Sequence, residues 1–300
     1  MNVFITGATG LIGSVFSRRL IEEGHCVTVL TRDALRARKR LGESVRCISS
    51  LSGMDNMDDF DAVVNLCGEN IGDKRWTVAQ KRLIEDSRWL PTEKIAALIK
   101  NSKKPPEVFI SGSAIGWYGS QADAILTEES KSAGGFLHDV CAKWENLALA
   151  AESGRTRVCI IRTGVVLAPS GGMLGKLEPF FKLGLGAVLG DGKQYMSWIS
   201  LDDIVGILLL LLENPAASGI FNACAPNPVR ADVFSHSFAS SLGRKCRFRI
   251  PEWLLKIVLG ERVQVMLASS RAIPNRLEKM SFKFSHPKLE TALKQIAGKV

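Results

Sequence analysis

The stretch 1-MNVFITGATGLIG-13 decides the fold of this chain. Residues 3–5 (VFI) form a β-branched and aromatic run, which predicts a buried strand. Glycines follow at positions 7, 10 and 13, and a helical pattern of apolar residues begins there. A strand, a glycine turn and a helix N-terminus form an anion site, because free backbone N–H groups and the positive end of the helix dipole meet there. In this context the glycine triplet predicts dinucleotide binding.

Composition limits the classes of protein that fit the chain. It has 300 residues, of which 46% are hydrophobic and 23% charged, enough for one large domain or two modest ones. Seven scattered cysteines without a C-x-x-C pair predict a reduced, cytoplasmic protein, and four isolated histidines predict no metal site. No basic segment precedes residues 3–5, and the apolar run 204–212 is too short to cross a bilayer, so we expect neither a signal peptide nor a membrane partner.

The formal net charge of +9 leaves two interpretations open. A basic surface attracts anionic ligands, nucleic acid among them, but it is also an ordinary solvated surface. The basic runs at residues 36–40 and 244–249 are not interleaved with the paired aromatic residues of an RNA-binding sheet. We therefore expect no nucleic-acid partner.

The hydrophobic pattern predicts strands that alternate with helices through the first half of the chain. Such alternation is typical of a parallel, doubly wound sheet, whose ligands lie beyond the carboxyl ends of the strands. A long helix is expected over residues 77–100, with a kink or a break near Leu90 because Pro91 follows. The other predicted helices are 13–23, 136–153, 204–212 and 232–242. The predicted strands are 3–5, 26–30, 45–49, 61–66, 108–110, 158–161 and 219–223.

The end of the second predicted strand bears on the choice of nucleotide. It lies about 20 residues after the glycine turn, where dinucleotide-binding proteins contact the adenosine ribose. The strand ends in Thr31-Arg32, and residues 36–40 add four more basic side chains. A guanidinium can hold a 2′-phosphate, whereas Asp33 lies one step late and is expected to cap the next helix. The sequence therefore predicts NADP in preference to NAD.

The chain changes character after Gly164. Residues 169–192 are glycine-rich and are expected to form loops around one short helix. Residues 200–203 (SLDD) resemble a capping box that opens the apolar helix to Leu212. From Pro251 onward the pattern is mainly helical. We predict a nucleotide-binding domain over residues 1–228, with substrate-side loops from about 165, and a small C-terminal domain over 229–300 that helps to shape a substrate pocket.

Several segments in the same order resemble the extended short-chain dehydrogenases/reductases. The whole length is similar to the atypical branch of that group known as epimerase family proteins, which adds a short C-terminal domain. The segments that carry the resemblance are TGATGLIG (6–13), SGS (111–113), WYG (117–119), NLCGENIGDKRW (65–76), RTGVVLAPSGG (162–172) and FFKLGLGAVLGDGKQYMSWISLDD (180–203).

The resemblance implies an α/β fold of the Rossmann type, a doubly wound parallel sheet with a smaller, mostly helical region on the substrate side. It implies an NAD(P) cofactor, which the end of the second strand narrows to NADP, and a small-molecule substrate bound by a monomer or a homodimer. The predicted cofactor contacts are Gly7, Thr9, Gly10, Leu11, Ile12, Gly13, Thr31, Arg32, Leu66, Cys67, Gly68, Arg88 and Val165.

The chain departs from the family at the catalytic motif. The catalytic motif of the superfamily is Tyr-x-x-x-Lys, and no such motif occurs in this sequence. Alignment of the helix on Trp144-Glu145 puts Leu137 at the tyrosine position and Cys141 at the lysine position. Arg88 stands where the family has an asparagine. Only the family's serine is kept, as Ser113.

The remaining candidates for catalysis are Ser113, Tyr118, Arg88 and Cys141, each with a structural alternative. Ser113 can bind a substrate oxygen or stabilise a turn, and Tyr118 can donate a proton or pack as a loop aromatic. Arg88 can bind a phosphate or carboxylate or form a surface ion pair, and Cys141 can act as a thiol base or as a buried apolar residue. Glu69 and Lys143 are weaker candidates. The first functional hypothesis is an NADP-dependent oxidoreductase or epimerase-like enzyme, and the alternative is a non-catalytic NADP(H)-binding sensor.

Overall fold

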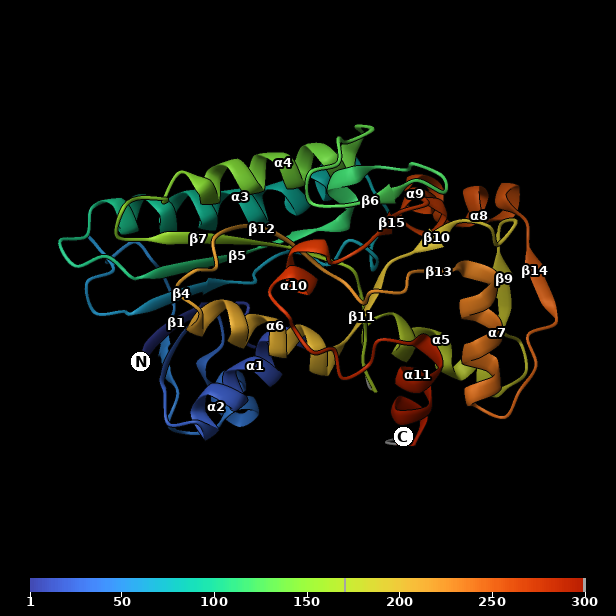
Figure 1. Ribbon diagram of the computed structural model, residues 1–300, viewed down its shortest axis with the longest axis horizontal. Helices are drawn as coiled ribbons and strands as arrows, with labels where there is room; N and C mark the ends of the chain where they lie inside the picture. The colour runs from blue at the N-terminus through green and yellow to red at the C-terminus, as the bar shows by residue number, and fades with distance from the viewer. Residues whose placement is uncertain (170, 299–300) are drawn as a thin grey trace.

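The computed structural model describes residues 1–169 and 171–298, and a seven-stranded parallel sheet forms its centre (Figure 1). The strand order is β12-β7-β5-β4-β1-β2-β3, which confirms the doubly wound topology. The direction of winding reverses between β1 and β4, so the carboxyl ends of these neighbouring strands border the expected ligand crevice. The strands are β1 (Asn2–Thr6), β2 (Cys26–Leu30), β3 (Arg46–Ile48), β4 (Ala62–Asn65), β5 (Val108–Ala114), β7 (Arg157–Thr163) and β12 (Gly219–Ala223).

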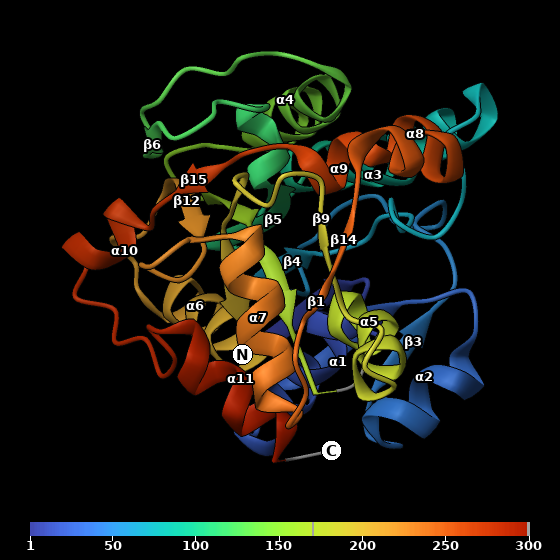
Figure 2. The same ribbon diagram turned by 90° about the vertical axis from the view of Figure 1, so that its right-hand side faces the viewer.

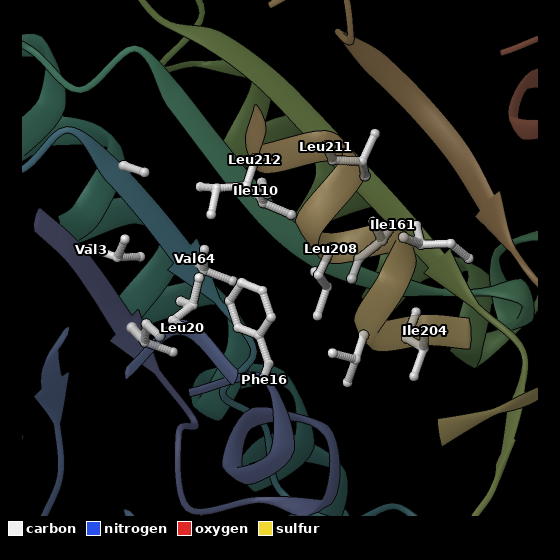
Figure 3. Close-up of a cluster of buried hydrophobic side chains, with 14 of the residues drawn as sticks. Val3, Phe16, Leu20, Val64, Ile110, Ile161, Ile204, Leu208, Leu211 and Leu212 are labelled. Carbon is white, nitrogen blue, oxygen red and sulfur yellow. The ribbon is translucent and has the colours of Figure 1, made fainter. Parts of the chain in front are cut away.

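Helices cover both faces of the sheet. On one face lie α1 (Leu11–Glu22), α2 (Ala34–Leu41) and α6 (Leu201–Glu213), and on the other lie α3 (Val78–Lys100) and α4 (Phe136–Leu149) (Figure 1). In Figure 3, Leu208 of α6 and Phe16 of α1 point toward Val64 and Ile110 of the sheet. Each such side chain contributes about 1.5–3 kcal/mol when fully buried, so this layer anchors the strands whose ends form the site.

Of the kink or break expected near Leu90, the break does not occur. The α3 helix runs without interruption over 23 residues and contains Pro91 in its interior. Proline cannot donate to the carbonyl of Ser87, one turn earlier. The Cys67 thiol approaches that carbonyl oxygen, with an Sγ–O distance of 3.5 Å, and comes closer, at 3.0 Å, to Asn65 Oδ1. Burial of Ile84 and Ile95 on either side of the proline holds the helix against the rest of the molecule.

The β5 strand is longer than the sequence pattern indicated. It continues past Ile110 to Ala114, because β7 pairs with it along that whole length. In this register Ser113 lies opposite Arg162 and Ala114 opposite Thr163. The pairing therefore places an arginine beside the serine that the sequence analysis singled out.

Among the described residues beyond 164, α6 and β12 belong to the layers of the sheet, and most of the other segments lie past the carboxyl ends of the strands (Figures 1 and 2). No helix among the described residues is long and apolar enough to cross a membrane. The elements of this region are β8 (Val165–Leu167), α5 (Gly172–Lys182), β9 (Ala187–Leu189), β10 (Tyr195–Met196), β11 (Trp198–Ser200), β13 (Val229–Arg230), α7 (Ala231–Ser241), β14 (Phe248–Ile250), α8 (Glu252–Leu259), η2 (Gly260–Arg262), α9 (Val263–Leu267), β15 (Arg271–Ala272), α10 (Asn275–Lys279) and α11 (Leu289–Ala297). The short η1 (Ile115–Tyr118) and β6 (Ile125–Leu126) follow β5.

The start of α6 ties the C-terminal segment to the sheet. Ser200 accepts a hydrogen bond from the backbone N–H of Asp203 at 3.0 Å, which confirms the predicted cap. The Asp203 carboxylate accepts from the backbone N–H groups of Ser285 (2.6 Å) and His286 (3.1 Å). The apolar cluster above the sheet joins Trp198 to Leu289 of α11. The predicted division at residues 228 and 229 stays a prediction, and residues 299–300 lie outside the described part of the chain.

Candidate functional site

The glycine turn after β1 is packed so closely that side chains cannot replace its glycines. Gly7 has a φ of +69°, and a Cβ built on it would lie 2.5 Å from the carbonyl oxygen of Leu66. A Cβ on Gly13 would lie 2.3 Å from the carbonyl oxygen of Gly7. The missing side chains therefore let α1 approach β1 and leave backbone N–H groups open to a ligand, which is the cradle that a dinucleotide pyrophosphate needs.

The N-terminus of α1 is free to bind an anion. Gly10 occupies the N-cap position, and no side chain caps the helix there. The first backbone N–H groups of α1 are thus available, and the helix dipole favours negative charge at this end. The glycine that begins α5 lies close by, since a Cβ on Gly172 would come within 3.1 Å of Leu11 Cδ2.

A buried polar network supports the turn from below. Thr6 donates to Asn65 Oδ1 at 2.5 Å, and Asn65 donates through Nδ2 to Thr92 at 2.7 Å. Cys67 Sγ lies 3.0 Å from the same Asn65 oxygen. Burial raises the pKa of the Cys67 thiol above its ordinary value, so the thiol stays protonated and acts as a donor. The ends of β1 and β4 are thereby held in one geometry.

The predicted ribose end of the site is open. Asp33 caps α2 by accepting from the backbone N–H of Arg36 at 2.9 Å, as the sequence indicated. Arg32 is exposed and makes no hydrogen bond with the described residues. Arg40 turns toward α1 and donates to Ser14 Oγ at 3.2 Å. Arg32 can therefore turn to an added phosphate without breaking a hydrogen bond.

Arg88 lies over the end of β4. Its guanidinium donates to the carbonyl oxygens of Ile84 (2.9 Å) and Glu69 (3.1 Å). It also lies against Gly68, where a Cβ would come within 2.9 Å of Cζ. Burial lowers the pKa of Arg88, and Cys141 and Cys67 oppose that shift. Arg88 thus orders the segment that follows β4, beside the predicted cofactor contacts Cys67 and Gly68.

Ser113 belongs to a buried cluster of charged groups. Its hydroxyl donates to Glu145 Oε1 at 2.5 Å. Arg162 binds the same carboxylate through Nε at 2.9 Å and Nη2 at 2.8 Å. The exposed fractions of Ser113, Glu145 and Arg162 are 5%, 3% and 1%. A bidentate pair with little access to water holds the carboxylate in a fixed position, with one oxygen against the serine.

Aromatic side chains enclose the arginine of this cluster. Arg162 Cζ lies 3.5 Å from the ring centre of Trp117, and Nη1 has no hydrogen-bond partner among the described residues. Tyr118 is fully buried, with its hydroxyl 2.7 Å from Asn222 Oδ1 and 2.9 Å from the carbonyl oxygen of Thr127. Burial raises the pKa of Tyr118 to about 12. The nearby Arg162 charge acts in the opposite direction, but its effect on this pKa is smaller than that of burial. A hydroxyl so engaged has no free path to a substrate.

The positions of the family's tyrosine and lysine hold no working base. Leu137 packs against Gly116, and Cys141 is buried, with its pKa raised to about 11 by burial and then by Glu145. Lys143 lies 4.0 Å from the ring centre of Trp89, and Glu69 pairs with Lys74 at 3.1 Å. Val165, by contrast, begins β8 and pairs with Trp198 at the open end of the sheet. Its place there agrees with the predicted cofactor contact, which stays a prediction.

Sequence reasoning missed Glu145 and Arg162 as members of the site. Both were used only as alignment markers. A signal was present, because Arg162 interrupts an apolar strand and a buried charge in a strand requires a partner. The partner could not be named from the sequence, since Glu145 is 17 residues away on a different element.

The sheet order, the glycine turn and the uncapped helix define the chain as a dinucleotide-binding protein of the Rossmann class. A model of the NAD dependent epimerase/dehydratase family matches residues 3–224, and a domain of unknown function (DUF1731) matches residues 250–296. The chain belongs to the NAD dependent epimerase/dehydratase family, in its extended short-chain dehydrogenase/reductase form with this C-terminal domain.

Curated relatives match nearly the whole chain. The epimerase family protein ML0860 of Mycobacterium leprae is 37% identical over 97% of this chain and 94% of its own length. The chloroplastic epimerase family protein SDR39U1 homolog of Arabidopsis thaliana is 36% identical over 99% and 86%.

Solved structures agree with this assignment. The crystal structure of human epimerase family protein SDR39U1 (isoform2) with NADPH has a TM-score of 0.92 at 30% identity and covers both chains completely. A nucleoside-diphosphate sugar epimerase from Corynebacterium glutamicum has a TM-score of 0.78 at 32% identity, where this chain spans 58% of the longer one.

Proposed function

We propose that this protein is an NADP(H)-dependent oxidoreductase or epimerase-like enzyme that acts on a small hydroxyl or carbonyl compound. The hydrogen bond from Ser113 to Glu145, inside the Glu145–Arg162 pair, carries this proposal. The serine keeps its family position at the carboxyl end of β5, where ligands of such sheets bind. The carboxylate gives it a proton acceptor that the family's tyrosine and lysine otherwise supply.

The geometry assigns directions to the hydrogen bonds. Because Ser113 donates to Glu145, its oxygen presents lone pairs to a ligand and can accept from a substrate hydroxyl. During oxidation the substrate proton passes to Ser113 as the serine proton passes to Glu145. The hydride released in this oxidation would pass to NADP⁺ when that cofactor is bound. Reduction of a carbonyl reverses each transfer, and Arg162 stabilises the carboxylate whenever it is charged.

The preference for NADP over NAD rests on Arg32. Its side chain is exposed at the end of β2, and Asp33 beside it is occupied as the cap of α2. A guanidinium without an internal hydrogen bond favours a 2′-phosphate over a free hydroxyl. NADPH should bind at least tenfold more tightly than NADH, a difference of about 1.4 kcal/mol.

Calorimetric titration of NADPH and NADH tests this preference. Arg32→Ala should remove most of the difference between the two dissociation constants. Arg19→Ala is the matched control. Arg19 is an exposed arginine on α1 that forms an ion pair with Glu23. Selectivity unchanged in Arg32→Ala would show that another residue recognises the phosphate.

Turnover is tested by NADPH oxidation across a panel of small aldehydes, ketones and nucleotide sugars. Ser113→Ala and Glu145→Gln should each lower kcat about a hundredfold, because each removes a group that transfers a proton. Both variants should still bind NADPH. Glu152→Gln, a change at an exposed glutamate, is the control. Background rates with every compound would contradict the enzyme proposal, and a wild-type rate in Glu145→Gln would exclude Glu145 as the proton acceptor.

One observation favours the alternative, a protein that binds NADP(H) as a signal without turnover. The positions of the family's tyrosine and lysine hold Leu137 and Cys141, and the Cys141 thiol with a pKa of about 11 is protonated at neutral pH. A Ser113→Ala variant that binds NADPH normally and loses a measured activity would exclude this alternative.

The remaining proposals concern the cellular compartment, the substrate class and the oligomeric state of the protein. All seven cysteines are free thiols, which supports a reducing compartment, and we propose the cytoplasm. We propose a small-molecule substrate and a monomer or homodimer, with no nucleic-acid partner. Size-exclusion chromatography with light scattering measures the oligomeric state directly.

A further inference from the structure

The end of the molecule farthest from α2 exposes an unusual set of apolar side chains. The α8 helix has eight residues, and only Leu255 among them is buried. Trp253 and Ile257 are 63% and 65% exposed, and Val258 is 63% exposed. Steps of four residues and of one residue turn a helix by about 40° and 100°, so these three side chains form a broad stripe that spans about 140° of one side of α8. A stripe of this kind is normally covered in a soluble protein.

The neighbouring β9–β14 ribbon extends the apolar stripe. Phe248 pairs with Ala187 across the ribbon and is 52% exposed. Leu183 and Leu185 precede β9 and are 75% and 54% exposed. Figures 1 and 2 place β9, β14 and α8 at the same end of the molecule. We call Leu183, Leu185, Phe248, Trp253, Ile257 and Val258 the distal surface.

Basic side chains border the distal surface. Residues 244–249 (RKCRFR) contain four cations and no acid, and all four cations are exposed. Arg244 lies against the turn that holds Leu183, because its Nε donates to the carbonyl oxygen of Lys182 at 2.9 Å. Arg249 donates to the carbonyl oxygen of Asp191 at 2.8 Å. Two nearby glutamates are already paired, Glu178 with Lys182 and Glu252 with Lys256, whereas the exposed Asp191 carboxylate accepts from the backbone N–H of Lys193.

We propose that the distal surface docks on an anionic membrane, with its apolar side chains in the interface and the basic segment on the lipid phosphates. Trp and Phe beside Lys and Arg are the composition that such interfacial elements use. Each cation near an anionic leaflet adds to the attraction, which falls with ionic strength. This proposal departs from the expectation of no membrane partner, which rested on the lack of a spanning segment. Surface docking does not require one.

The α8 helix and the turn after it contact the segment that follows β4. Arg75 donates to the carbonyl oxygen of Ile257 in α8 at 3.2 Å, and Arg262 donates to the carbonyl oxygen of Gly72 at 3.1 Å. Lys81 and Glu261 form an ion pair between the same two segments. Residues 72–81 follow the end of β4, so the distal surface adjoins the segment that Arg88 orders.

Vesicle co-sedimentation of the full chain tests the proposal. Vesicles of phosphatidylcholine alone should bind little, whereas admixture of phosphatidylglycerol at about one part in three should pellet the protein, and salt should reverse this. Arg247→Glu/Arg249→Glu and Trp253→Ser/Ile257→Ser should each weaken binding at least about tenfold. NADPH binding should not change, because none of these residues belongs to the candidate site.

Two control variants separate the role of the distal surface from the effects of net charge and of exposed apolar side chains elsewhere in the protein. Lys103→Glu/Lys104→Glu makes the same change in net charge at the amino edge of the sheet, and Leu35→Ser/Val78→Ser removes two other exposed apolar side chains. Both controls should bind as wild type does. The proposal is overturned if anionic vesicles bind no protein, if all variants bind equally, or if sedimentation velocity shows a dimer that only Trp253→Ser/Ile257→Ser dissociates.

Discussion

The glycine turn and the Ser113 cluster lie at the same edge of the sheet but are built in opposite ways. The turn is contiguous in sequence, and it depends on side chains that are missing, with Gly7 and Gly13 allowing backbone to touch backbone. The cluster joins three elements and depends on side chains that are present, with Glu145 held between Ser113 and Arg162. A backbone cradle is distorted by an added atom, whereas a buried charge pair is destabilised by a lost partner.

The largest effect should come from breaking the charge pair. Arg162→Met leaves the Glu145 carboxylate buried without its partner and should lower the free energy of unfolding by about 3–5 kcal/mol. Urea unfolding followed by circular dichroism measures the change. Glu145→Gln/Arg162→Met removes both charges and should be more stable than Arg162→Met alone. If the loss of unfolding free energy in the double variant equals the sum of the losses in Glu145→Gln and Arg162→Met, the two residues are not coupled.

A pH effect on stability should follow from Tyr118, which packs beside the cluster. Its pKa is raised from 10.0 to about 12, so the folded state keeps a proton that the unfolded state releases. This stabilisation is complete below pH 10 and is lost as the pH rises toward 12, by about 3 kcal/mol in all. The difference in unfolding free energy between wild type and Tyr118→Phe should shrink over that window. A difference independent of pH would mean that the hydroxyl titrates normally.

The smallest of these effects is expected for the glycine turn, although it concerns the cofactor directly. Gly13→Ala places a Cβ against the Gly7 carbonyl and should cost about 1–3 kcal/mol, because the backbone must shift. The melting temperature should fall, and NADPH binding should weaken with it. Gly53→Ala is the control, since a Cβ there meets nothing within 4 Å. Equal melting temperatures for the two variants would show that the turn has room to relax.

The same contrast explains which parts of the molecule were predictable. The order of strands and helices, the cap at Asp33 and the cap at Ser200 follow from local patterns, and the structure confirms them. Of the kink or break expected near Leu90, the break is wrong, since α3 runs through Pro91 without interruption. Local rules could not include the tertiary contacts of this helix, such as the Cys67 thiol near the Ser87 carbonyl, 20 residues away in sequence.

The candidate site divides along the same line. Ser113 was identified from its place after a predicted strand, but the length of β5 and its register with β7 were not predicted. Tyr118 was proposed as a proton donor, and the structure instead places its hydroxyl against Asn222, more than a hundred residues later. The roles of the catalytic candidates stay predictions, and the geometry favours Glu145 over Tyr118 as the proton-transfer group.

The amino-acid sequence alone determines the cradle of this protein, because glycine spacing, strand periodicity and helix caps act over a few residues and leave local signatures. It also indicates the family through the order of several such segments. Tertiary structure alone decides the Ser113–Glu145–Arg162 cluster and the exposed stripe on α8. Charge pairing in a dry interior and the covering of an apolar face depend on which distant elements meet, and only the folded chain brings them together.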